Sequence, residues 1–394
     1  MGSALTLLPL AAFDPATLPG QLVYGILIGS IYALIALGYT MVYGILKLIN
    51  FAHGEVFMLG AYVALFISWA LGYTPEEMQR APMPSSLLVL GLMLVGSMVV
   101  CGLVGVLIEF MAYRPMRSRP RISALITAIG VSLLLQYGGS LFLPVSPPPV
   151  IREEANPLQG SLRVWVQKPP EPLLAEYTLV EKEFEAAQKD YRSEQYKLRT
   201  NQTDADKVAA KADKLSEVRT RYSDLERKIQ PDSIRLILPH GLLVMAGTSL
   251  VLMLFLRWLV MKTKIGRGMR AVSQDFDSAA LMGVNVNTVV FTTFLIGSAL
   301  AGAGAMMYAL FQGLTITTFF GVAPGLKGFV AAVVGGIGNI PGAVLGGLIM
   351  GVAEALVIWS GLDMFKDAFG FVILIIVLLI LPKGILGSNK VEKV

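Results

Sequence analysis

The sequence predicts an all-α polytopic membrane protein, and three observations support this. Hydrophobic residues make up 55% of the 394 residues and charged residues only 15%, whereas soluble domains carry about 25% charge. Apolar runs of the roughly 20 residues that a helix needs to cross a bilayer recur along the chain. Forty glycines agree with this class, because glycine is frequent in membrane helices. We expect about eight transmembrane helices plus a broken or re-entrant helical hairpin, with an inserted periplasmic helical hairpin.

The expected spans divide the chain into residues 1–149, with helices 1–4, and residues 237–394, with the remaining helices. The predicted spans are Gln21–Leu46, Phe51–Leu71, Ser86–Met111, Ile122–Leu143, Gly241–Met261, Thr288–Gln312, Ala343–Trp359 and Ala368–Leu381. A further apolar arm, Phe329–Gly336, is too short to span. It runs into the glycine-rich run Gly335–Gly342, so the broken or re-entrant hairpin is expected here, where protein or a cavity must satisfy the irregular backbone.

Glycines repeat every fourth residue in these helices. Gly25 with Gly29, and Gly347 with Gly351, each lie on one helical face. Such faces let helix backbones approach closely. The alternative is that glycines are simply common in these helices.

Charge predicts the orientation. Short loops rich in Lys and Arg stay in the cytoplasm. Three segments fit this rule: the loop Tyr113–Arg121 with four arginines, the loop 262–287 that follows the fifth span, and the C-terminal tail. The N-terminus and residues 150–236 are then expected outside.

The charged insertion, residues 150–236, has a helical pattern of its own. Residues 151–235 hold sixteen basic and sixteen acidic residues, so the net charge of +5 belongs to the membrane part. Apolar residues fall at heptad positions in two runs separated by the turn-like segment Thr200–Asp204. We therefore expect an antiparallel coiled-coil hairpin, either a docking or dimerising element or a tolerated insertion without a partner. The two apolar runs are Tyr177, Val180, Phe184, Ala187, Tyr191 and Leu198, and Val208, Leu215, Val218, Tyr222, Leu225 and Ile229.

No enzyme site is apparent in the sequence. The two histidines, His53 and His240, have no Ser, Cys or metal-ligand company, and the single Cys101 lies within an apolar run. The chain has no G-x-x-x-x-G-K-[ST] phosphate loop, so we expect a transport subunit without its own ATPase motif. No cofactor, metal or nucleic acid is expected to bind it.

Three long stretches resemble one family. They are GILIGSIYALIALGYTMVYGILKLINFAHGEVFMLGAYVAL within Tyr24–Leu71, GRGMRAVSQDFDSAALMGVNV at Gly266–Val286, and GFVAAVVGGIGNIPGAVLGGLIMGVAEAL with the ending ILPKGILGSNKVEKV within Gly325–Val394. With ISALITAIGVSLLLQ they resemble the LivH-type permease subunit of high-affinity branched-chain amino acid ABC importers. The insertion departs from the compact outer loop of that family, so the resemblance implies nothing about it.

The resemblance implies a function and partners. It implies a permease in the bacterial inner (plasma) membrane that moves branched-chain, hydrophobic amino acids into the cytoplasm. The implied partners are a second permease subunit, two cytoplasmic ATPase subunits that use the ATP, and a periplasmic substrate-binding protein, together with the lipid bilayer. Three alternatives stay open: a urea or short-amide permease of the same family, an ion-coupled secondary transporter, and a receptor that uses the outer hairpin.

The cytoplasmic loop 262–287 is the expected contact with the ATPases. Asp277-Ser278-Ala279 followed by Gly283 approximates the E-A-A-x-x-x-G motif of importer permeases, with Asp in place of Glu and Ser in place of the first Ala. The segment Arg267–Gly283 has helix character of its own, with Ser273 as a candidate cap. The resemblance implies that such a helix docks on the ATPase. The candidate coupling residues are Arg267, Arg270, Asp277, Ala279 and Gly283. Arg267 and Arg270 are alternatively simple positive-inside anchors.

Polar residues at membrane depth are the candidates for translocation or gating, because they are costly there unless they face a cavity or a partner. Asn50, His53 and Glu55 join the first two spans, where a gating or structural role is favoured over direct substrate contact. Gly338 and Asn339 lie in the glycine-rich run, whose helix ends could meet the charges of an amino acid. Glu354 follows this run. Each is alternatively a satisfied structural group.

Overall fold

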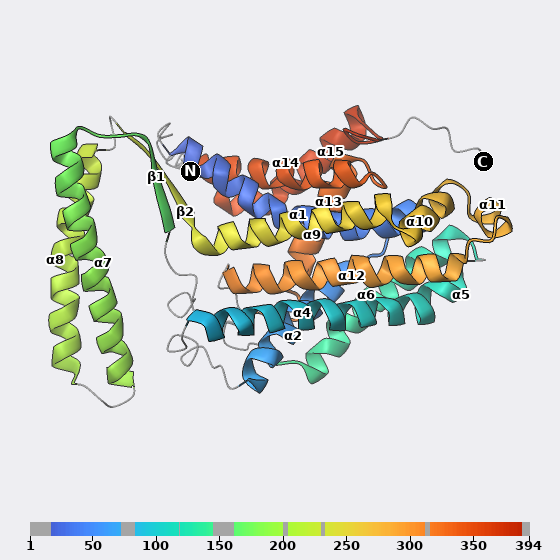
Figure 1. Ribbon diagram of the computed structural model, residues 1–394, viewed down its shortest axis with the longest axis horizontal. Helices are drawn as coiled ribbons and strands as arrows, with labels where there is room; N and C mark the ends of the chain where they lie inside the picture. Colours follow the sequence, from blue (N-terminus) through green and yellow to red (C-terminus); the bar gives the residue numbers. More distant parts are fainter. Residues whose placement is uncertain are drawn as a thin grey trace, which may run out of the picture. The chain divides into compact units, whose positions relative to one another are not determined.

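The computed structural model divides into two compact units, a helical bundle and the charged insertion (Figure 1). The bundle comprises residues 21–160 and 239–394, and the insertion comprises residues 161–238. The structure describes residues 17–71, 83–117, 119–144, 161–199, 204–229, 233–311 and 316–387.

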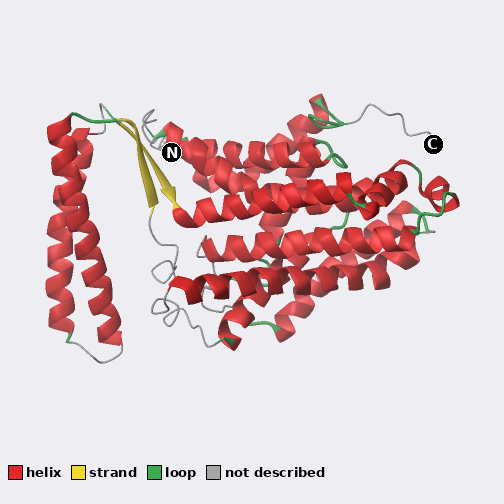
Figure 2. Cartoon of the chain, viewed as in Figure 1, coloured by secondary structure: helices red, strands yellow, loops and turns green. Residues whose placement is uncertain are grey.

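Seven helices in the described part of the bundle are long and apolar enough to cross a membrane. The helix α13 (Val322–Gly335) is shorter, as is α15 (Lys366–Ile380). This architecture confirms the predicted all-α polytopic membrane class (Figure 2). The seven are α1 (Leu18–Leu46), α2 (His53–Ala70), α4 (Met83–Ile108), α6 (Arg121–Phe142), α9 (His240–Lys262), α12 (Val286–Phe311) and α14 (Ile340–Trp359).

Short elements join these helices. A π-helical turn, η1 (Glu109–Tyr113), and a single turn, α5 (Arg114–Met116), continue α4. The loop 262–287 folds into α10 (Lys264–Gln274) and α11 (Phe276–Leu281). A 3₁₀ turn, η4 (Asp363–Phe365), precedes α15.

The core of the bundle lies around α1, α2 and α12. The apolar window is 78% buried in α1 and 72% buried in α12, but only 11% buried in α6. Helix α12 packs against α2, α4 and α9 (Figure 1). Large apolar side chains therefore remain exposed on α6 and α9 in the single chain, where they can meet lipid or another subunit.

Helices α1 and α14 touch along their glycine faces, as the four-residue repeats predict. A Cβ atom on Gly351 would lie 2.2 Å from the carbonyl oxygen of Gly25 and 2.4 Å from the Cα of Gly29. A Cβ on Gly347 would lie 2.4 Å from the backbone nitrogen of Ala33. The two backbones are thus in direct contact, and the absence of side chains sets how close the helices come.

The insertion contains the two helices expected and a small sheet that was not. Helices α7 (Glu171–Arg199) and α8 (Ala205–Ile229) pack side by side. Strands β1 (Ser161–Gln167) and β2 (Ile234–Pro239) pair into a two-stranded sheet. The buried cluster of the insertion consists of Tyr177, Val180, Leu225 and Ile229, all at predicted heptad positions. The predicted turn Thr200–Asp204 lies outside the described residues except for Asp204.

Strand β1 is attached to α7 by charge and by aromatic contact. Arg163 forms ion pairs with Glu181 and with Glu185 at 2.8 Å. The ring of Trp165 meets that of Tyr177 edge to face, with centroids 5.8 Å apart. These contacts make the sheet and the helix pair one body.

Replacing Gly351 with alanine should separate α1 from α14. The added methyl group would overlap backbone atoms of Gly25 and Gly29, and overpacking of this kind costs about 1–3 kcal/mol. The thermal unfolding midpoint of the purified protein in detergent should therefore fall.

The matched control is Gly247→Ala in α9, where nothing lies within 4 Å of the added Cβ. Its midpoint should stay the same or rise slightly, because alanine favours helix more than glycine does. Equal midpoints for the two variants would contradict the glycine contact.

Candidate transport site and coupling loop

Helix α2 begins inside the bundle rather than at its surface. Helix α1 is followed by Lys47, whose φ of 53° turns the chain back toward the core. The ring of His53, the first residue of α2, lies against Gly38, so that a Cβ there would be 2.3 Å from His53 Nε2. The same Cβ would be 3.0 Å from the carbonyl oxygen of Gly297, near the middle of α12. The start of α2 therefore lies level with the centre of a spanning helix.

Helix α13 begins at the same place, in backbone contact with α2. A Cβ on Gly321 would lie 1.8 Å from the carbonyl oxygen of Gly54, and one on Gly325 would lie 2.8 Å from the Cα of Gly54. Neither helix has a side-chain cap at its start. The first N–H group of each, that of His53 and that of Val322, donates to a carbonyl oxygen of the preceding turn. Two helix N-termini thus meet inside the bundle, an arrangement found at the binding sites of several transporter folds.

The predicted residues Asn50, His53 and Glu55 lie at this junction but point toward different helices. Asn50 accepts a hydrogen bond from Tyr113 of η1 at 3.1 Å. His53 forms a hydrogen bond with the backbone of Ile35 in α1. Glu55 accepts a hydrogen bond from Ser132 of α6 at 2.7 Å.

Each of these three buried side chains keeps one polar atom without a protein partner in the described part of the chain. The atoms are Asn50 Nδ2, His53 Nε2 and Glu55 Oε2. A buried polar group without a partner is destabilising, so the junction can form further hydrogen bonds, with Asn50 Nδ2 as a donor. A gating or structural role for the three residues stays a prediction.

A shallow apolar depression with about 10 Å³ of free volume, room for about one water molecule, adjoins the junction. Its lining comes from α1, from the α1–α2 connection and from α13 and the turn that follows it. The aromatic rings of Tyr39 and Phe329 meet edge to face there, with centroids 5.8 Å apart. The lining residues are Tyr39, Tyr43, Ile49, Phe329, Ala332 and Ile337.

Glu354 belongs to an ionic cluster that joins four helices. Lys327 Nζ of α13 lies 2.9 Å from Glu354 Oε1 of α14 and 2.7 Å from Asp367 Oδ1 of α15. The hydroxyl of Tyr32 in α1 donates to Glu354 Oε2 at 2.6 Å. Because a buried charge is costly unless it is paired, this cluster holds α1, α13, α14 and α15 together. A transport role for Glu354 stays a prediction beside this structural one.

The glycine-rich run turns the chain at the end of α13, where the last carbonyl groups of the helix meet the C-terminal tail. Gly336 and Gly338 have φ values of 103° and 93°, a region that glycine adopts readily. The carbonyl groups of Val334 and Gly335 accept hydrogen bonds from the backbone of residues 385 and 386. The end of α13 is therefore already paired.

Asn339 caps the next helix. It accepts a hydrogen bond from the backbone nitrogen of Gly342 at 3.3 Å and donates to the carbonyl oxygen of Leu386 at 2.7 Å. A direct role for Gly338 and Asn339 with cargo stays a prediction. The observed contacts give both residues a part in the fold.

The loop 262–287 presents α11 on an exposed turn. Asp275, rather than Ser273, caps this helix by accepting from the backbone nitrogen of Ser278 at 2.7 Å. That hydrogen bond lowers the pKa of the Asp275 carboxyl, so the cap is ionised and favours the helix N-terminus. Ser273 instead donates to the carbonyl oxygen of Arg270.

The candidate coupling residues differ in how far their side chains are exposed to solvent. Arg267 and Asp277 are exposed and Ala279 is buried. Arg270 donates to the carbonyl oxygen of Val260 at the end of α9, which anchors the loop. Gly283 ends the turn with a φ of 82°. Their role in coupling stays a prediction.

Sequence reasoning missed two charged members of the ionic cluster, Lys327 and Asp367, and it began α13 too late. Pro324, Gly325 and Lys327 interrupt the apolar run, so the expected arm started at Phe329 rather than Val322. A single lysine within an otherwise apolar helix was the available signal. Proline is tolerated in the first turn of a helix.

The chain matches the family model described as "Branched-chain amino acid transport system / permease component" over residues 21–164 and 185–381. No solved structure matches it.

Full-length relatives give the same result. The chain is 34% identical over 374 residues to the high-affinity branched-chain amino acid transport system permease protein LivH of Escherichia coli (strain K12) and of Salmonella typhimurium (strain LT2). It is 35% identical to the corresponding protein BraD of Pseudomonas aeruginosa. Each alignment covers 95% of this chain and 97% of the relative. The chain therefore belongs to the permease component family of branched-chain amino acid transport systems.

Proposed function

We propose that this chain is the membrane permease subunit of an ATP-binding cassette importer that moves branched-chain amino acids into the cytoplasm. The observation that carries the proposal is the similarity over 97% of the length of branched-chain amino acid permeases. A relationship of this extent includes the bundle, the helix junction and the cytoplasmic loop.

The junction of α2 and α13 supports a path for this cargo. A branched-chain amino acid carries a carboxylate, an ammonium group and an apolar side chain. Uncapped helix N-termini favour a carboxylate, and the neighbouring depression is lined by apolar and aromatic side chains. Weak contacts suit a permease, because the cargo must also leave.

The exposed end of α11 supports a docking role on a cytoplasmic ATPase. Leu281 is 89% exposed and Met282 is 84% exposed, and large apolar side chains clustered at a surface mark interaction sites. We infer a complete importer with a second permease subunit, two ATPase subunits and a periplasmic binding protein.

The orientation follows from the basic residues. Arg114 and Arg117 lie at one end of the bundle, and Lys262 and Lys264 flank the turn between α9 and α10. The positive-inside rule puts both segments in the cytoplasm. The chain then lies in the inner membrane with the insertion in the periplasm.

Leucine uptake into proteoliposomes tests the function. The vesicles contain this chain with its partner permease, ATPases and binding protein, and radiolabelled leucine is supplied with or without ATP. Uptake should require both ATP and the binding protein, and isoleucine and valine should compete while urea should not.

Competition by urea alone would assign the cargo to short amides instead. Uptake driven by an ion gradient without the ATPases would contradict the ABC importer.

Replacing Leu281 with aspartate should weaken the ATPase contact. A charge at the centre of an apolar contact removes a major binding residue, which typically weakens binding roughly tenfold or more. Less ATPase should copurify with the variant, and uptake should fall in parallel.

Met364→Asp is the matched control, because Met364 is 87% exposed and lies outside α11. It belongs to η4, which follows the C-terminal end of α14. The variant should copurify normally. Equal loss in both variants would contradict docking through α11.

A further inference from the structure

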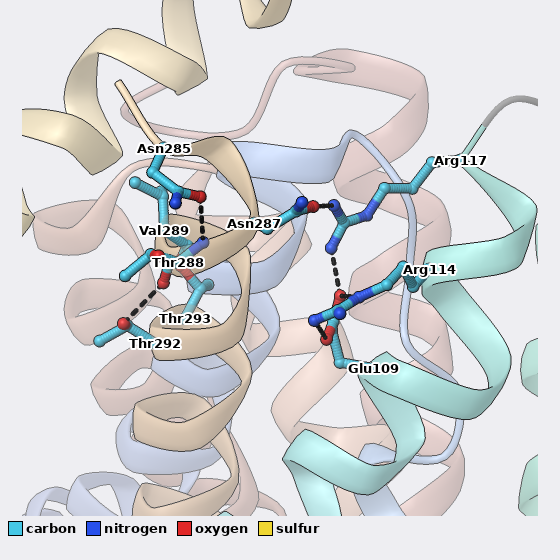
Figure 3. A network of polar contacts seen from close by, with 9 residues as sticks. All are labelled: Glu109, Arg114, Arg117, Asn285, Asn287, Thr288, Val289, Thr292 and Thr293. Carbon is cyan, nitrogen blue, oxygen red and sulfur yellow. Dashed lines mark hydrogen bonds and ion pairs between the residues drawn. The ribbon is translucent and has the colours of Figure 1, made fainter. Parts of the chain in front are cut away.

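An ionic cluster at the end of α4 connects this helix to α12 (Figure 3). The Glu109 side chain is fully buried and accepts from Arg114 Nε at 3.2 Å and Nη2 at 2.8 Å. It also accepts from Arg117 Nη2. Arg117 Nη1 donates to Asn287 Oδ1 of α12 at 2.7 Å. We name these four residues the Glu109 clamp.

The clamp depends on the π-helical turn η1. The backbone nitrogen of Arg114 donates a hydrogen bond to the carbonyl oxygen of Glu109, five residues earlier. In an α-helix, side chains three and four residues apart face each other, but a π turn aligns residues five apart. The two-pronged pairing of Glu109 with Arg114 is of the strong bidentate kind. The clamp and the π turn therefore stabilise each other.

One end of the clamp meets the cytoplasmic loop. Asn287 is the second residue of α12, just after the loop. The side chain of Asn285 accepts from the backbone nitrogen of Thr288 at 3.1 Å (Figure 3). The backbone nitrogen of Val284 bonds to the carbonyl oxygen of Ala279 at 3.0 Å. These two hydrogen bonds restrain the short segment that links α11 to Asn287.

The π turn that carries Glu109 also meets the connection between α1 and α2. The Tyr113 hydroxyl, in the last residue of η1, donates to Asn50 Oδ1 at 3.1 Å and lies 3.3 Å from the Ile49 carbonyl oxygen. Its ring is tilted against Phe294 of α12, with centroids 5.2 Å apart. Tyr113 is 1% exposed, so it cannot move without moving the chain around it.

The π turn of η1 differs from an α-helical turn by one residue in its hydrogen bonding. Its conversion to an α-helical turn would shift the following residues by about one residue of helix, a rotation of about 100° and a rise of about 1.5 Å. Such a change would take Tyr113 away from Asn50. A coupling route needs an element with two discrete states that both sites bias, and a π turn that converts to an α-helical turn would be such an element.

We propose that the Glu109 clamp is a positioning element that transmits movement of the cytoplasmic loop to the α1–α2 junction by holding or releasing the π turn. This inference rests on the proposed function as an ATP-driven permease. The loop pulls on Asn287, Asn287 positions Arg117, and Arg117 with Arg114 positions Glu109. Tyr113 then holds or releases the α1–α2 connection through its hydrogen bond to Asn50.

A purely structural anchor would behave differently. A buried carboxylate that loses its cations is strongly destabilising, so an anchor lowers the amount of assembled complex. A transmission element lowers the cargo moved per ATP and leaves the complex intact. Asn287 separates the two, because it is exposed on α12 and its loss leaves Glu109 paired with both arginines.

The experiment compares Asn287→Ala, Asn287→Asp and Arg119→Gln in the reconstituted importer, with leucine uptake and ATP hydrolysis measured on the same vesicles. Asn287→Ala should keep ATP hydrolysis within about twofold of wild type and lose roughly tenfold in uptake, within the range of typical site-to-site coupling. Asn287→Asp keeps the acceptor for Arg117 and should restore uptake. Arg119, an exposed arginine outside the clamp, should be replaceable without effect.

Two results would overturn the proposed role of the clamp. In the first, the Asn287→Ala variant takes up leucine as fast as wild type does. In the second, its uptake, its ATP hydrolysis and the amount of assembled complex all fall together. Failure of the wild-type importer to use ATP would instead remove the proposed function. The two failures are therefore distinguishable.

Discussion

Two helices of the bundle, α2 and α13, begin in its interior, and the rest of the structure has to accommodate the polar backbone that this exposes. In a membrane, unpaired N–H and C=O groups are tolerated only where protein or a cavity satisfies them. Gly54, Gly321 and Gly325 bring the two backbones into contact, and α1 and α12 enclose them. The pairing of the α13 end with the C-terminal tail meets the same need at the other end of that helix.

Charge within the bundle is organised around this junction. Lys327 pairs with carboxylates of α14 and α15 on one side, and Glu109 pairs with two arginines at the end of α4. Each cluster joins helices that are distant in sequence, so each fixes packing that apolar contact alone leaves adjustable. In lipid, apolar surfaces give helices little specificity, and paired charges supply it.

The sequence predicted the helices better than the site, for a physical reason. Spans such as Gln21–Leu46 follow from bilayer thickness and local composition, both of which are readable in one segment. The pairing of Glu354 with Lys327 joins side chains 27 residues apart on different helices, and no periodicity reveals it. Strands β1 and β2 were missed because they lie in a highly charged segment. The alternation of exposed Leu162, Val164 and Val166 with inward-facing Arg163 and Trp165 was their signal.

The state of the buried carboxylates bears on where the energy for transport comes from. An ion-coupled carrier needs carboxylates that bind and release a cation during its cycle. Glu109 and Glu354 are held by arginine and lysine in the described structure, and Glu55 has a hydroxyl partner in Ser132. Releasing Glu109 would take the carboxylate partner from Arg114 and Arg117, which is costly. Lys327 would keep Asp367 as a partner if Glu354 were released. The ion pairs of Glu109 and Glu354 therefore favour the proposed importer, driven by another protein that would bind at the exposed α11, over an ion-coupled carrier.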